Sequence, residues 1–312
     1  MLQILSLLVS CPKSFDLCGG VSDQCVDSYT TIYESMELGD KLTRKQVKNA
    51  IMTSLYGSTS TPEKTFVGNV DLFYETMETM APGAWDLNLG LQELWHKISG
   101  STYTWVLPDN FHACIETKTK VLVPFTFMDK DHAVPKKIDG RPEFHKGLGP
   151  NLIHSIDGMV VREMYRRCMY NPQTIARVEH AMKYPVKGIT FQSAPRVQEL
   201  WGHYQETGFL SVRILDYLFD DTIGLVDHDV IKALIATLPK KPFQLVSNHD
   251  CFRCHPNYGN DLRRQYNTIM ADINDSTILT SMACQVANKR IKIKKYGKIS
   301  RNTILEANYM LA

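Results

Sequence analysis

The sequence predicts an α+β protein in which helices dominate and short strands are few. Segments with apolar residues three or four apart indicate amphipathic helices, and short apolar runs bounded by turn residues indicate strands. The expected helices span residues 2–10, 23–38, 42–56, 68–80, 88–98, 150–168 and 259–274. The expected strands span residues 102–107, 111–116, 119–128, 243–249, 251–255 and 290–296. The strands 243–249 and 251–255 are close enough in sequence to form a hairpin.

The composition allows a large core and argues against a protein that binds polyanions over its whole surface. The chain has 312 residues, of which 44% are hydrophobic, and its formal net charge is only +2. Positive charge is instead local, in the clusters Lys41, Arg44, Lys45 and Lys48; Lys118 and Lys120; Lys136 and Lys137; and Lys289, Arg290, Lys292, Lys294, Lys295 and Lys298. The last cluster alternates with Ile291, Ile293 and Tyr296, a pattern equally typical of phosphate contact and of an edge strand protected by lysines.

Cysteine usage and hydropathy favour a cytoplasmic location. The eight cysteines are scattered without a repeating framework, which suits a reducing compartment better than a disulfide scaffold. No apolar run reaches the roughly 20 residues that a membrane-spanning helix needs. The sequence therefore predicts a cytoplasmic protein without a membrane segment.

The segment Leu42–Gly57 carries the clearest chemical pattern. Arg44, Lys48 and Tyr56 share one broad face of the expected helix, and Gly57 follows its end. Lys48 and Tyr56 are about 12 Å apart along the axis, a span that suits a nucleoside triphosphate. A guanidinium and an ammonium together suit its phosphates. The alternative is a solvated basic face that ends in an ordinary Tyr-Gly turn.

The pattern Arg-x3-Lys-x7-Tyr-Gly resembles the fingers helix of the single-subunit DNA-dependent RNA polymerases of phages and mitochondria. The resemblance implies that Arg44 and Lys48 bind the incoming triphosphate. It also implies that Tyr56 helps to select ribonucleotides, and that Gly57 lets the backbone approach the nascent base pair.

Further motifs follow in the order found in that family. Residues 107–111, LPDNF, resemble its TPDGF turn, with Asn110 in place of glycine; asparagine tolerates the same left-handed backbone. Residues 149–158, GPNLIHSIDG, resemble APNFVHSQDG, which implies that His154 lies at the minor groove near the growing end. Residues 304–312 resemble the family's last residues, whose terminal carboxylate packs close to the active site.

The catalytic metal site is implied by residues 243–252, FQLVSNHDCF, which resemble the family's IHDSF hairpin with Cys251 in place of serine. The resemblance makes Asp250 one of two carboxylates that hold catalytic Mg²⁺ in a two-metal mechanism. His249, next to it, is expected either to orient Asp250 or to contact the primer end.

The start of the chain resembles the segment that follows the other catalytic aspartate. Residues Gln3–Leu8 resemble the family's IQHFSAML, which comes directly after that residue. We therefore expect either a second polymerase chain that supplies the first catalytic Asp and the N-terminal domain, as in a split phage enzyme acting in a bacterial host cell, or a truncated reading frame. Two-chain assemblies known in the family favour the split enzyme. This chain alone is expected to be inactive. Its other partners would be template DNA, nascent RNA and ribonucleoside triphosphates.

The resemblance implies a partial right-hand polymerase, with helical fingers packed on an antiparallel palm sheet. The expected divisions are mainly helical fingers at 1–103, palm strands and a helix at 104–167, a helical insertion at 168–241, and the palm catalytic hairpin with the C-terminal segment at 242–312. No match to the family is visible in the insertion. Its expected helices span residues 173–182, 197–204, 210–219 and 229–238.

One rival interpretation is a c-type haem protein. Cys251, Cys254 and His255 form a CxxCH motif, which attaches haem through two thiols and an iron-ligating histidine. The apolar residues Leu2–Val9 resemble a signal segment, as an exported cytochrome would need, although no basic residue precedes them. Ordinary thiols on a hairpin strand give the same motif by chance.

The residues are also compatible with a zinc site, a non-catalytic subunit or a DNA polymerase. A zinc site could be assembled from His249, Cys251, Cys254 and His255, but no second CxxC pair is present to complete a common tetrahedral pattern. The chain could instead be a degenerate, non-catalytic subunit with a polymerase fold, or part of a DNA polymerase with a similar palm.

Overall fold

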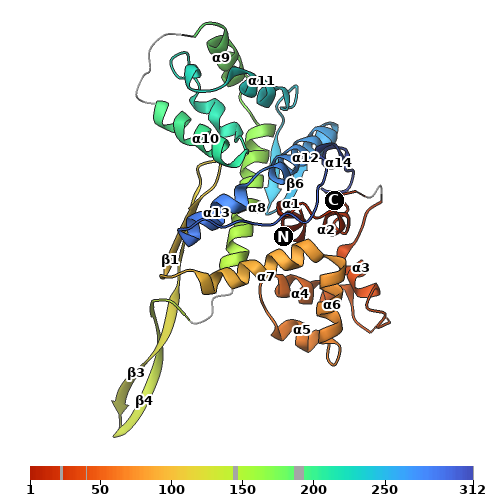
Figure 1. Ribbon diagram of the computed structural model, residues 1–312, viewed down its shortest axis with the longest axis vertical. Coiled ribbons are helices and arrows are strands. Elements are labelled where there is room, and N and C mark those ends of the chain that lie inside the picture. The colour runs from red at the N-terminus through yellow and green to blue at the C-terminus, as the bar shows by residue number, and fades with distance from the viewer. Residues whose placement is uncertain (22–23, 40, 143–146, 186–192, 312) are drawn as a thin grey trace.

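Helices form most of the regular structure, and short antiparallel strands form the rest. The structure is a computed structural model that describes residues 1–21, 24–39, 41–142, 147–185 and 193–311. The expected mixture of helices and antiparallel strands is confirmed. The molecule is elongated, with a helical subdomain at one end, a hairpin projecting from the other, and both chain termini near the middle (Figure 1).

The helices are α1 (Leu2–Leu8), α2 (Pro12–Asp16), α3 (Ser28–Glu34), α4 (Arg44–Leu55), α5 (Ser60–Thr65), α6 (Val70–Met80), α7 (Pro82–Lys97), α8 (Leu148–Cys168), α9 (Pro172–Lys183), α10 (Ala194–Thr207), α11 (His228–Ala236), α12 (Gly259–Asp275), α13 (Ile278–Ala287) and α14 (Arg301–Glu306), with short 3₁₀ helices η1 (Val212–Tyr217), η2 (Ile223–Leu225) and η3 (Pro256–Tyr258). Among the described residues, no helix combines the length and apolar character needed to cross a bilayer.

The described strands pair two by two and do not join into a single sheet. The pairs are β1 (Thr102–Val106) with β2 (His112–Glu116), β3 (Lys118–Phe127) with β4 (Lys130–Asp139), and β5 (Leu245–Asn248) with β6 (Cys251–Cys254), all antiparallel. The broader palm sheet that the sequence led us to expect is therefore not assembled by the described strands alone.

The helix α1 lies at the centre of the main core. Its residues from Ile4 to Leu8 are all buried, and it packs against α7, α8 and α12. A helix that is apolar on nearly all sides has to be enclosed by other elements. The two sites described below lie near opposite ends of α1.

The helices α9, α10 and α11 enclose a second, smaller core at the top of Figure 1. The helices expected at 173–182, 197–204 and 229–238 are present, while 210–219 contains the 3₁₀ helix η1. This subdomain is tied to α8 by Glu163, a buried carboxylate that accepts hydrogen bonds from the Ser211 hydroxyl and, at 3.1 Å, from the Val212 amide.

The LPDNF turn between β1 and β2 also joins the two cores. Asn110 has a φ of +57°, so it adopts the left-handed backbone expected from the sequence. The carboxylate of Asp109 is fully buried and accepts hydrogen bonds from Arg162 Nε at 2.6 Å and Arg166 Nη1 at 3.0 Å, both on α8. Arg213 of the second core donates to the Asp109 carbonyl oxygen at 2.8 Å.

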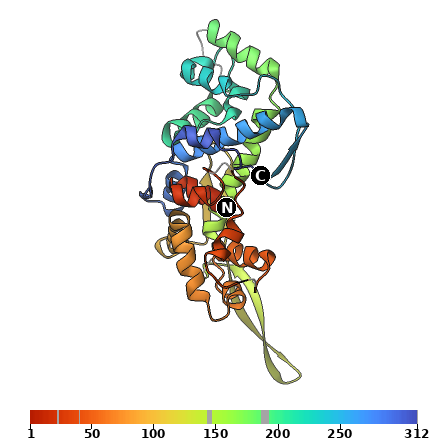
Figure 2. The ribbon, with the colours of Figure 1, turned by 90° about the vertical axis from the view of Figure 1, so that its right-hand side faces the viewer.

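The β3–β4 hairpin projects away from the body, as Figures 1 and 2 both show. Its turn residues Met128 and Asp129 have φ values of +49° and +56°, the left-handed pair that suits a two-residue hairpin loop. Strand β4 was not expected, because Pro135 and several charges obscure its pattern. Proline is tolerated here because both strands of a two-stranded sheet are edges.

The prediction of a strand at 290–296 is wrong. Residues 289–298, which we call the basic strap, run in an extended form without pairing to any described strand. The strap is instead held by other contacts, including the hydrogen bond from the Tyr296 amide to the Val9 carbonyl oxygen at 2.7 Å. Edge-strand protection therefore does not explain its lysines.

Candidate active site

Helix α4 presents two of the predicted cations to solvent. Its first turn is closed by a capping box in which the Thr43 hydroxyl accepts from the Gln46 amide and the Gln46 side chain accepts from the Thr43 amide. Val47 is buried against the core, whereas Arg44 and Lys48 are exposed. The helix thus holds both cations one turn apart on its outer face.

The two cations gather around Tyr29 of α3, a residue that the sequence did not single out. Arg44 Cζ lies 5.7 Å and Lys48 Nζ 5.5 Å from the centre of the Tyr29 ring. These are cation–π distances. The ring therefore keeps the two positive groups together.

Arg44 also forms an ion pair with Asp27, the N-cap residue of α3. Its Nε contacts Asp27 Oδ2, and its Nη2 donates to Oδ1 at 3.1 Å. The hydrogen bond from Arg44 is the largest cause that lowers the pKa of Asp27, and the same bond raises the pKa of Arg44. A phosphate that binds Arg44 has to compete with this carboxylate.

The end of α4 positions Tyr56. The Ser58 amide donates to the Thr53 carbonyl oxygen and the Gly57 amide to the Ser54 carbonyl oxygen, both at 2.9 Å, which is a Schellman motif. Gly57 has a φ of +79°, a left-handed conformation that glycine adopts without a steric cost. The half-buried Tyr56 ring then lies 5.5 Å from the ring of His154 on α8.

Asp250 and His249 form the two-residue turn of the β5–β6 hairpin, and both are exposed. His249 has a φ of +57°, a left-handed backbone that only a few per cent of non-glycine residues adopt. The hairpin is fixed to α8 through Tyr165, whose hydroxyl accepts from the Ser247 amide at 3.0 Å. The same helix therefore supports the hairpin and His154.

The negative charge of Asp250 acts on the Tyr56 hydroxyl. Burial is the main reason that the pKa of Tyr56 is raised, and the negative charges of Asp157 and Asp250 raise it further. The same two carboxylates contribute to the raised pKa of Tyr266 on α12, after burial. The pKa of Tyr29 is also raised, mainly by burial and then by the charges of Cys18 and Tyr56. Residues from α3, α4, α8 and the hairpin turn thus form one connected group.

Asp157 is the site residue that sequence reasoning missed, although it belongs to the GPNLIHSIDG motif. Its Oδ2 lies 3.7 Å from Nδ1 of His154, one helical turn earlier. Burial raises the pKa of Asp157; the Met1 amino group and His154 lower it, and Asp250 raises it. The net result is a raised pKa, mainly because of burial, and the charge of Asp250 adds to it.

The floor of the site is built from α12, α1 and the C-terminal segment. The partly buried Tyr266 hydroxyl donates to Gln3 Oε1 at 2.9 Å, and Gln3 Nε2 donates to the Met310 carbonyl oxygen at 3.0 Å. The position of the terminal carboxylate near an active site stays a prediction. The terminal residue, Ala312, lies outside the described residues.

The donor set is compatible with Mg²⁺ that enters together with a nucleotide. Mg²⁺ prefers carboxylate oxygen and is usually held by one or two carboxylates plus phosphates and water. Asp157 and Asp250 supply such oxygens, and a divalent cation would relieve their repulsion. No set of three or more His, Cys, Asp or Glu side chains among the described residues is arranged to hold a metal ion by itself.

The thiols of the CxxCH motif lie on strand β6. Cys251 is exposed and Cys254 is partly buried, and alternation along a strand directs them to opposite faces. Among the described residues, His249, Cys251, Cys254 and His255 are not arranged to hold a metal ion together.

Comparison with known proteins assigns no family: no family model matches the chain, and no curated protein matches it significantly.

Proposed function

We propose that this chain is the nucleotide-binding and metal-binding part of a DNA-directed RNA polymerase. The proposal rests on the contact between the rings of Tyr56 and His154, which come from segments far apart in the sequence, and on the charge of Asp250, which helps to raise the pKa of Tyr56. Two exposed cations on the same helix as Tyr56 extend the group on one side. The sequence motifs had assigned roles to these residues separately, and packing of the core does not require an exposed Lys48, His154 or Asp250.

In this proposal, each side chain does what its chemistry suits. Arg44 and Lys48 hold the β- and γ-phosphates of the ribonucleotide, with Arg44 exchanging Asp27 for a phosphate oxygen. The rings of Tyr56 and His154 frame the nascent base pair, with His154 toward the minor groove. Asp250, next to His249 in the turn, and Asp157 face the reacting phosphate.

Bound Mg²⁺ would activate the RNA 3′-hydroxyl and stabilise the leaving pyrophosphate. Asp250 is the proposed protein ligand, and Asp157 would help to attract the cation. A second strong carboxylate ligand is proposed to come from a partner chain. The β5–β6 pair supports this idea, because neither of its outer edges is paired with a described strand, so both could receive a further strand.

RNA extension on a primed template tests the proposal. The complex is isolated under native conditions through an affinity tag on this chain, then supplied with an RNA-primed DNA template, ribonucleotides and Mg²⁺. We expect extension by the complex, none by the chain alone, and none by a complex that carries Asp250→Ala. The matched control is Asp129→Ala, which alters the tip of the β3–β4 hairpin and should leave extension unchanged.

Two results would count against the proposal. Robust extension by the purified chain alone would remove the need for a partner carboxylate, and unchanged extension by the Asp250→Ala complex would remove Asp250 from the metal site. If the complex extended the primer with deoxyribonucleotides in preference to ribonucleotides, it would be a DNA polymerase instead.

A further inference from the structure

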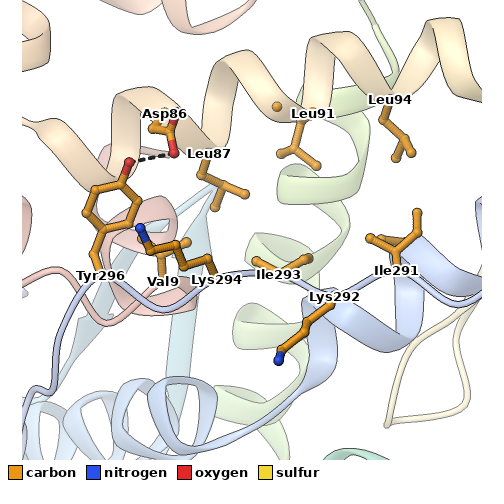
Figure 3. Close-up of a pocket in the computed structure, with 12 residues that line it drawn as sticks. Val9, Asp86, Leu87, Leu91, Leu94, Ile291, Lys292, Ile293, Lys294 and Tyr296 are labelled. Atoms are coloured by element: carbon orange, nitrogen blue, oxygen red, sulfur yellow. Dashed lines mark hydrogen bonds between the residues drawn. The ribbon is translucent and has the colours of Figure 1, made fainter.

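The basic strap forms one wall of an apolar cavity on the outside of the main core. Figure 3 shows Leu87, Leu91 and Leu94 of α7 pointing toward Ile291 and Ile293 of the strap, with a space between them. The cavity has a volume of about 200 Å³. It is open to the surface and large enough to receive an apolar side chain of another polypeptide.

The strap is held firmly enough to keep this cavity in shape. Besides the Tyr296 amide bond to Val9, the Tyr296 hydroxyl donates to Asp86 at 2.5 Å (Figure 3). Lys295 Nζ donates to the carbonyl oxygens of Leu8 at 2.8 Å and Asn274 at 3.2 Å. These hydrogen bonds therefore fix the strap at the C-terminal end of α1, away from Met1 and the candidate active site.

The surroundings of the cavity are strongly positive. Between Asp275 and Glu306 the sequence has no acidic residue, and it has the cations Lys289, Arg290, Lys292, Lys294, Lys295, Lys298 and Arg301. Arg301 is paired with Asp272 and Asp275.

The other six cations have no carboxylate partner among the described residues: Lys289 and Lys295 donate to backbone carbonyl oxygens, and the rest are Arg290, Lys292, Lys294 and Lys298. The carboxylates that α7 offers nearby are engaged, Asp86 by Tyr296 and Glu93 by Lys97 at 3.5 Å. Like charges crowded without counter-charges repel each other, and a negatively charged partner would relieve this repulsion.

We propose that the cavity and the basic strap are a docking site for an acidic polypeptide segment. One large apolar side chain of the segment enters between α7 and the strap, and its carboxylates face the unpaired lysines. The cavity walls favour a polypeptide over a nucleic acid, because apart from Tyr296 their apolar side chains are aliphatic, whereas unpaired bases stack on flat aromatic faces. The proposal does not depend on polymerase activity.

Gly90 of α7 allows a sharp test, because it lines the cavity and is exposed. Apart from Gly90 itself, its two chain neighbours and the nearby backbone of the same helix, no heavy atom of the described residues lies within 4 Å of a Cβ built at this position, so side chains fit there without a clash. Gly90→Leu would fill the mouth of the cavity. Gly90→Ala is the matched control, since alanine also suits a helix interior but is too small to block entry.

The probes are two labelled synthetic peptides, glutamate-rich and identical except for tryptophan or alanine at the centre, and a thymidine oligonucleotide of equal charge. Binding to the full chain is measured by fluorescence anisotropy at constant low salt. We expect the tryptophan peptide to bind about tenfold or more tightly than the alanine peptide. Gly90→Leu should abolish this difference, Gly90→Ala should keep it, and Lys292→Glu with Lys294→Glu should weaken both peptides.

Three outcomes would overturn the proposal. Equal binding of the two peptides would mean that the cavity takes no side chain. Tighter binding of the oligonucleotide would assign the strap to nucleic acid. Failure of both peptides to bind the unaltered chain would leave the positive charge without a polypeptide partner.

Discussion

The ring of Tyr56, at the end of α4, lies 5.5 Å from the ring of His154 on α8, with the two planes tilted by 38°. The pair links the cations of α4 to the carboxylates Asp157 and Asp250. Burial is the main cause of the raised pKa of Tyr56, and the charges of these two carboxylates raise it further. A substrate that touches both ends of this group would have its phosphates near α4 and its reacting atoms near the hairpin turn. The Tyr56–His154 pair lies where its sugar and base would be.

The first prediction concerns the Tyr56 hydroxyl. Tyr56→Phe keeps the ring contact with His154 and removes only a hydrogen-bonding group. We expect discrimination between ribonucleotides and deoxyribonucleotides to fall about tenfold, the value of roughly one hydrogen bond, while the rate with ribonucleotides stays nearly unchanged. The measurement is the ratio of kcat/KM values for the two sugars in the isolated complex. Unaltered discrimination would show that Tyr56 does not contact the sugar.

The second prediction separates Lys48 from the general positive charge of α4. Lys48→Ala should weaken binding of a fluorescent Mg²⁺–ribonucleotide to the chain about tenfold, because one charge-assisted contact to phosphate is lost. Lys45→Ala is the control, since Lys45 lies on the same exposed helix but outside the Tyr29 cluster. If both substitutions weaken binding equally, the helix attracts nucleotides only through its net charge.

The third prediction follows from the ion pair between Arg44 and Asp27. Asp27→Asn keeps an oxygen that can cap α3 but removes the negative charge that holds Arg44. Nucleotide affinity should therefore rise about threefold, because an exposed ion pair is worth less than about 1 kcal/mol. Titration with the same fluorescent nucleotide measures the change. A fall in affinity would instead mean that Asp27 positions Arg44 for the phosphate.

Local chemistry made several parts of the candidate site predictable. The helix of Lys48 and Tyr56 follows from apolar spacing and a glycine stop, and the hairpin turn of Asp250 follows from two short apolar runs. Asn110 adopts the left-handed backbone that its place in the turn suggested. In each case the controlling interactions lie within a few residues of one another.

Contacts between distant segments were not predictable. Asp27 and Tyr29 matter because α3 packs beside α4, and Asp157 matters because the hairpin turn lies beside α8. The basic strap alternates like a strand, yet it pairs with no described strand, and its apolar residues Ile291 and Ile293 face α7 across the cavity instead. Sequence period reports which residues face the core, not which element they meet.

The last prediction concerns the buried ion pairs that join the LPDNF turn to α8. Asp109→Asn preserves the shape of the side chain but leaves Arg162 without its buried counter-charge and Arg166 with that of Glu163 alone. The free energy of unfolding at pH 7 should fall by about 3 kcal/mol. The control is Asp139→Asn, which removes an exposed partner of Lys118 and should change stability by less than about 0.5 kcal/mol.

Acid should erase the difference between the Asp109→Asn variant and the unaltered chain. Burial by itself would raise the pKa of Asp109, but hydrogen bonds and charge from Arg162 and Arg166 outweigh it and lower the pKa. The stabilisation is therefore complete above the unfolded-state pKa of about 4 and is lost as the pH falls through the lower folded-state pKa. Urea denaturation of both proteins between neutral and acidic pH measures this. A difference that stays constant below pH about 4 would show that the charge of Asp109 does not stabilise the fold.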